Sequence, residues 1–141
     1  MDTKVKKLIE RQIRQLSKLK KRLNKLADLI HTKPKDEALI LHEFTILLEK
    51  YNANPAILKL FTIFLQLMDD KKIIKTYRLE HILLLNNELA RFNPLDLESQ
   101  LERYYFLHNI MNDELEADIQ LAKTKKIIET EFLIVEQYRS K

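Results

Sequence analysis

The sequence predicts an all-α fold: a five- or six-helix antiparallel bundle or a stack of helical hairpins, with a long basic N-terminal helix. The 141 residues include no Gly and only three Pro, and the abundant Leu, Lys and Glu favour helices. Residues 55–68 are apolar around nearly the whole circumference of a helix, relieved only by Lys59, Thr62 and Gln66. Because each large apolar side chain left in water forfeits roughly 1.5–3 kcal/mol, we expect other helices or a partner to surround this segment.

The predicted N-terminal helix covers residues 2–31. Its apolar residues follow heptad spacing, with Gln12 as the one polar member, and Pro34 ends the helix. The seam consists of Val5, Ile9, Leu16, Leu19, Leu23, Leu26 and Ile30. A parallel coiled-coil dimer would repel, because Lys6, Lys20 and Arg22 flank the seam without acidic counterparts. We therefore expect the seam to pack on the chain's own body.

Five further helices are predicted, over about residues 36–51, 55–68, 71–92, 97–111 and 114–138. Asn54-Pro55 and Asn93-Pro94 mark turns between them, and Asp36, Asn54 and Asp96 are N-caps. Asn112-Asp113 breaks the chain again. The last helix is expected to bury an apolar face made of Leu115, Ile119, Ala122, Ile127, Phe132 and Val135.

The order of these elements predicts a single domain over residues 1–141, with residues 1–32 as a basic arm helix and residues 36–141 as a body of helical hairpins. The hairpins 55–92 and 94–138 have the length of helical repeats, roughly 40 residues. The small and Gly positions of tetratricopeptide repeats are missing, so a plain up-and-down bundle accounts for the same pattern.

Charge is distributed unevenly along the chain. Residues 1–35 hold twelve Lys or Arg against three acids, whereas the remainder holds thirteen bases and eighteen acids. The most acidic part of the remainder is 96–118. The candidate contacts to an anionic partner are Lys4, Lys7, Arg11, Arg14, Lys18, Lys21, Arg22 and Lys25. They extend for about 30 Å along one helix face, a strip that suits nucleic-acid phosphates or anionic lipid. A purely solvated face, or docking of the arm on region 96–118, explains the same charges.

No catalytic or metal-binding motif emerges. Without Gly and Cys the chain cannot form Gly-dependent phosphate loops, disulfides or thiolate metal sites. Asp28 and His31 are the only pair at metal-ligand spacing, and they stand at a helix end. We therefore predict no metal, no cofactor and no enzymatic activity. His42-Glu43 is similar to the His-Glu pair of sensor kinases, so a histidine phosphotransfer bundle using His42 or His81 stays a further alternative.

Three consecutive aromatic residues, Tyr104, Tyr105 and Phe106, point in different directions on a helix, so at least one should approach the surface. An exposed ring there would suit contact with a protein partner, and a tyrosine whose hydroxyl lies at the rim of the core explains the same pattern. The leading prediction is a non-enzymatic helical interaction or adaptor module that binds a protein partner or a second copy of itself. The alternative is a small nucleic-acid-binding protein that uses the basic N-terminal helix. Neither a signal peptide nor a transmembrane segment is evident, which predicts a cytoplasmic protein.

Overall fold

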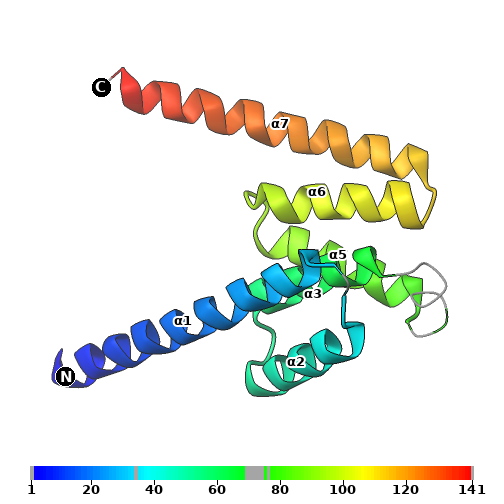
Figure 1. Cartoon of the computed structure of the whole chain (residues 1–141). Coiled ribbons are helices and arrows are strands. Elements are labelled where there is room, and N and C mark those ends of the chain that lie inside the picture. Colours follow the sequence, from blue (N-terminus) through cyan, green and yellow to red (C-terminus); the bar gives the residue numbers. More distant parts are fainter. Residues whose placement is uncertain (1, 34, 69–74, 76, 141) are drawn as a thin grey trace. The chain divides into compact units, whose positions relative to one another are not determined.

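The computed structural model describes residues 2–33, 35–68, 75 and 77–140, and in this part of the chain every regular element is a helix. The all-α prediction is confirmed (Figure 1). The helices are α1 (Asp2–His31), α2 (Glu37–Lys50), α3 (Pro55–Leu67), α5 (Leu79–Phe92), α6 (Leu97–Tyr105), the π-helical turn η1 (Phe106–Ile110) and α7 (Glu114–Arg139). None of the described helices is long and apolar enough to cross a membrane.

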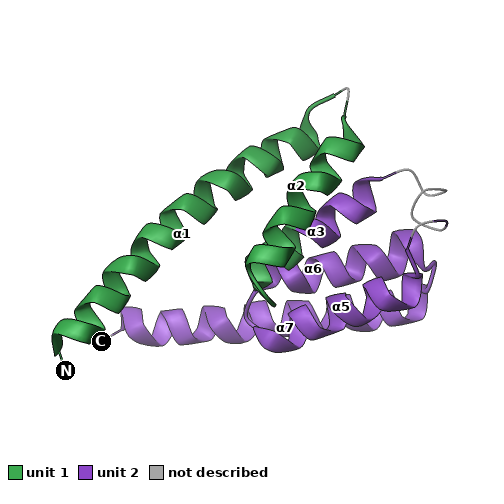
Figure 2. Cartoon of the chain, turned by 90° about the horizontal axis from the view of Figure 1, so that it is seen from below, with its two compact units in different colours: residues 1–60 green, residues 61–141 purple. Residues whose placement is uncertain are grey.

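The contacts divide the chain into two compact units, residues 1–60 and residues 61–141 (Figure 2). The boundary falls inside α3. The prediction of a single domain with a basic arm stays a prediction.

Unit 1 contains α1 and α2, which pack against each other through the second half of α1. The buried residues are Leu19, Leu26 and Ile30 on α1 and Ile40, Phe44 and Leu47 on α2. Asp36 caps α2 as predicted, because its Oδ1 accepts a hydrogen bond from the Leu39 amide at 3.1 Å. Across the pair, Arg22 lies 3.7 Å from the Glu43 carboxylate.

Only the second half of the α1 seam is buried within the chain. Residues 2–18 are all exposed, and Val5, Ile9 and Leu16 remain 49%, 54% and 64% accessible. The expectation that the whole seam packs on the chain's own body is therefore wrong for its first half. The physical reason is length: α1 has 30 residues, whereas α2 has 14 and can cover only about half of it.

Helix α3 confirms the predicted helical segment at residues 55–68. It begins at Pro55, and Asn54 Oδ1 accepts hydrogen bonds from the amides of Ala56 and Ile57. Within 55–68, five residues are buried, only Ala56 and Leu67 are exposed, and the rest are half-buried. In unit 2, the amide of Gln66 donates to Glu102 of α6 at 2.8 Å.

The predicted helix over 71–92 is interrupted in the structure, although Lys75 is helical. Residues 71–74 and 76 lie outside the described residues, but Tyr77 and Arg78 are not helical, and α5 starts at Leu79. Arg78 has extended dihedrals (φ −79°, ψ 123°).

In unit 2, α5, α6 and α7 pack in chain order, with α6 between the other two (Figure 1). Asn93 and Asp96 form the predicted turn, with the Asp96 amide donating to the Asn93 carbonyl at 3.0 Å. The predicted helix 97–111 changes at Phe106 into the π-turn η1. Asn112 then adopts a left-handed conformation (φ 53°), and Asp113 caps α7 by accepting from the Glu116 amide.

The buried face of α7 differs from the predicted one. Leu115, Ile119, Ala122, Phe132 and Val135 are exposed and Ile127 is half-buried, whereas Ala117, Gln120 and Thr124 are buried. The expected apolar face is therefore wrong. A polar stripe faces α6 because its groups find hydrogen-bond partners there, which removes the cost of burying them.

Candidate functional site

The first half of α1 combines a basic face with an exposed apolar stripe. All the predicted anion contacts of α1 are exposed except Arg22, which is half-buried beside Glu43. The exposed apolar residues are Val5, Leu8, Ile9, Ile13 and Leu16. We call these five residues the α1 open stripe. Because successive residues turn by about 100°, the stripe lies on one side and the cations of Lys7, Arg11 and Lys18 on the other.

A second exposed apolar surface lies on the second half of α7. Ile128, Phe132, Leu133, Ile134 and Val135 are each at least 39% accessible. They follow directly after the part of α7 that packs against α6. Their exposure arises for the same geometric reason as that of the α1 open stripe, since α7 has 26 residues and α6 has only 9.

The three aromatic residues at 104–106 have different surroundings. Phe106 is 1% accessible, Tyr104 is half-buried and Tyr105 is 46% accessible. The Tyr104 ring stacks on His108, with centroids 5.6 Å apart and an interplanar angle of 7°. Of the three candidate partner contacts, Tyr105 is the one whose ring is offered most to solvent.

The histidines do not form a cluster in the described part of the chain. His31, His42, His81 and His108 are all exposed, and no group of His, Asp or Glu there could hold a metal ion. Glu43, the acid next to His42, is the ion-pair partner of Arg22. No observation brings a further catalytic group to His42 or His81, so the phosphotransfer alternative stays a prediction.

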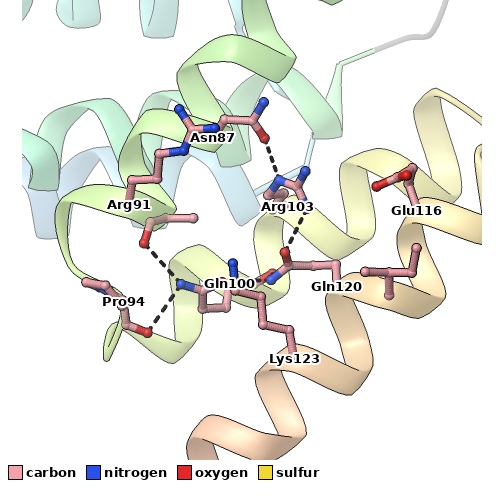
Figure 3. Close-up of a pocket in the computed structure, with 10 residues that line it drawn as sticks. Asn87, Arg91, Pro94, Gln100, Arg103, Glu116, Gln120 and Lys123 are labelled. Atoms are coloured by element: carbon pink, nitrogen blue, oxygen red, sulfur yellow. Dashed lines mark hydrogen bonds between the residues drawn. The ribbon is translucent and has the colours of Figure 1, made fainter.

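The structure reveals a buried polar cluster that sequence reasoning missed (Figure 3). Gln100 of α6 and Gln120 of α7 are each 2% accessible. Gln120 Nε2 donates to Gln100 Oε1 at 2.7 Å, and Gln100 Nε2 donates to the carbonyls of Ala90 and Pro94. The cluster therefore ties α6 to α7 on one side and to the end of α5 on the other.

Arg103 of α6 completes the cluster. Its Nε donates to Asn87 Oδ1 on α5, and its Nη1 donates to Gln120 Oε1 at 2.7 Å (Figure 3). Burial lowers the pKa of the Arg103 guanidinium, the charge of Glu116 opposes this shift, and the charge of Arg91 adds to it. An arginine stays protonated despite such a shift. The side chain is thus a fixed, partly desolvated positive charge.

A cleft of about 340 Å³ opens beside this cluster, between α5, α6 and α7. Its wall carries three cations, Arg91, Arg103 and Lys123, against the single acid Glu116. In the sequence, these four residues can be recognised only as separate charged residues. The spacing of Gln100, Arg103 and Gln120 is helical, but nothing local identifies polar residues 17 or 20 positions apart as partners.

No protein-family model matches this sequence, and no similar curated protein or solved structure was found.

Proposed function

We propose that this chain is a non-enzymatic helical interaction module that binds a partner protein through the α1 open stripe. The observation that carries the proposal is the continuity of the α1 seam. The stripe that buries Leu19, Leu26 and Ile30 against α2 continues in the same heptad register into Val5, Ile9 and Leu16, which remain exposed. Contiguous exposed apolar surface of this kind is typical of protein interaction sites.

Charge favours an acidic amphipathic helix as the occupant of this stripe. The stripe offers a row of aliphatic side chains, which suits the helix-in-groove mode of recognition. Lys4 and Lys6 flank it and are exposed. A partner helix with an apolar face and acidic flanks would bury the stripe and neutralise these cations, which increases both the association rate and the specificity.

The test compares two charge-matched variants of the full chain in its native host. Ile9→Glu/Ile13→Glu places two acids inside the stripe, at positions already exposed, so the fold is expected to survive. Gln15→Glu/Ser17→Glu adds the same charge at exposed positions outside the stripe. After cross-linking and mass spectrometry, we expect the wild type and the second variant to link to an acidic helical segment of the same partner.

The first variant is expected to lose that partner at least ten-fold, because each charge pressed into an apolar contact costs on the order of 1.4 kcal/mol or more. Equal recovery of the partner by both variants would contradict the proposal. Sedimentation of the purified chain tests whether a second copy of the chain covers the stripe. Self-association that is lost only in the Ile9→Glu/Ile13→Glu variant would identify this second copy as the occupant in place of a foreign helix.

A second candidate function, nucleic-acid binding through α1, is favoured by the exposure of its cations. Lys4, Lys7, Arg11 and Arg14 belong to a segment in which every described residue is accessible. A strip of this length gives affinity that falls steeply with salt, by a slope of about 0.9 per phosphate contact.

We therefore expect the Lys4→Glu/Lys7→Glu/Arg11→Glu/Arg14→Glu variant to lower the salt slope of duplex-DNA binding by about 3 to 4 if these cations contact phosphates. A variant with Lys75, Lys125, Lys126 and Arg139 changed to Glu alters the net charge equally at exposed positions elsewhere. Retention on heparin and DNA measured at several salt concentrations gives the slope. The same slope in both variants would remove α1 from a nucleic-acid role.

A further inference from the structure

The guanidinium of Arg103 lies in the cleft of unit 2 and makes no ion pair with a described residue, although the charge of Glu116 on the same wall acts on it. Both of its acceptors, Asn87 Oδ1 and Gln120 Oε1, are neutral amide oxygens. Glu116 lines the same cleft, yet among the described residues no ion pair reaches Arg103. A guanidinium has five N–H groups, so three of those on Arg103 make no hydrogen bond within the described chain.

The amides that hold Arg103 are themselves fixed. Gln120 Nε2 donates to Gln100 Oε1, to the Gln100 carbonyl and to Thr124 Oγ1, and Gln100 is anchored on the carbonyls of Ala90 and Pro94. A cationic fork held in this way loses little further freedom when a ligand binds. Such preorganisation lowers the entropic cost of binding.

The remaining wall of the cleft strengthens the positive charge. Arg91 and Lys123 are exposed and line the cleft together with Arg103 (Figure 3). Arg91 also pairs with Glu88 at 3.3 Å, but that pair is solvent-exposed and contributes little. The volume of about 340 Å³ falls within the range of sites for small molecules.

We propose that the cleft between α5, α6 and α7 binds a small oxyanion ligand, a molecule with a carboxylate or phosphate group, through the Arg103 guanidinium and the Lys123 ammonium. A planar guanidinium with unused N–H groups matches two oxygens of either group. The bound anion supplies the negative charge that the neutral amides around Arg103 do not. This site is separate from the α1 open stripe and does not depend on the proposed partner.

The experiment titrates the full-length ¹⁵N-labelled chain with inorganic phosphate and, separately, with citrate, at constant ionic strength. We expect saturable shifts of the Arg103 Nε–Hε resonance and of backbone amides around Gln100 and Gln120. Lys123→Gln is expected to weaken binding about ten-fold, the usual effect of losing one charge-assisted hydrogen bond. Lys126→Gln removes the same charge from an exposed α7 position outside the cleft and should leave the affinity unchanged.

Arg103→Gln is expected to abolish the saturable shifts. If that variant fails to fold, the comparison of Lys123→Gln with Lys126→Gln decides the question. Saturation by phosphate alone supports a phosphate ligand, and saturation by citrate alone supports a carboxylate. The proposal is overturned if neither probe gives a saturable shift, or if Lys123→Gln and Lys126→Gln bind with equal affinity.

Discussion

Replacing Phe106 with Ala is expected to lower the free energy of unfolding by about 3–5 kcal/mol, the range for deleting a buried phenyl ring. Phe106 is 1% accessible and begins the π-turn between α6 and α7. Its removal leaves a cavity that the surrounding side chains can only partly fill, because protein interiors are close-packed. Since small domains are stable by only about 5–15 kcal/mol, this one substitution is expected to remove a large share of the total.

Tyr105→Ala provides the matched control, because it deletes the neighbouring aromatic ring at a position that is 46% accessible. We expect it to cost less than about 1.5 kcal/mol, since much of this ring is already in water. Urea denaturation followed by circular dichroism gives both values. Equal losses in the two variants, or a greater loss for Tyr105→Ala, would mean that η1 does not bury Phe106 in solution.

Helix termini were predictable from the sequence because their signals are local. The bounds of α1, the Asn54-Pro55 start of α3 and the Asp113 start of α7 all agree with the structure. A cap needs only a side-chain oxygen two or three residues from the amide that it satisfies. These features therefore depend on residues that are adjacent in the sequence, and no tertiary contact is needed to interpret them.

The break at Tyr77 and Arg78, before α5, was not predictable in this way. No capping side chain marks Arg78. Where local signals are weak, packing of the apolar face decides how far a helix extends. The buried residues of α5, including Ile82 and Leu89, all lie after Leu79.

Hydrophobic periodicity also failed to identify which face of α7 is buried. The method assigns apolar residues to the interior, and α7 buries Gln120 and Thr124 while exposing Leu115 and Ile119. The Gln120 amide is satisfied by Gln100, 20 positions earlier on α6. A pairing over that distance has no local signature. The candidate site around Arg103 was missed for the same reason.

The α1 seam was predictable only in part. Its heptad spacing was visible in the sequence, and the register is correct where Leu19, Leu26 and Ile30 are buried. What the sequence did not show is how much of the seam finds a partner within the chain. That depends on the length of α2, and the unmatched remainder is the surface that the proposed function uses.

Replacing Gln120 with Leu is expected to destabilise the chain by about 2–4 kcal/mol. The substitution removes one side chain from the buried hydrogen-bonded cluster and leaves its buried partners unsatisfied. Gln100 Oε1 loses its donor at a site that is 2% accessible, and Arg103 Nη1 loses its acceptor. Thr124 keeps its hydrogen bond to the Gln120 backbone carbonyl, so the loss is confined to the side-chain cluster. Gln137→Leu makes the same chemical change at an exposed position of α7 and should stay within about 0.5 kcal/mol of the wild type.

A double-mutant cycle with Gln100→Leu then separates pairing from packing. If the two amides act as a pair, the double variant is expected to lose less than the sum of the single variants, by about 1–2 kcal/mol. That outcome follows because the second substitution removes the group that the first one left without a partner, and two leucines at a helix interface pack against each other. Strictly additive losses would show that Gln100 and Gln120 do not hold α6 to α7. The amide that fixes Arg103 would then lack the rigidity that anion binding in the cleft requires.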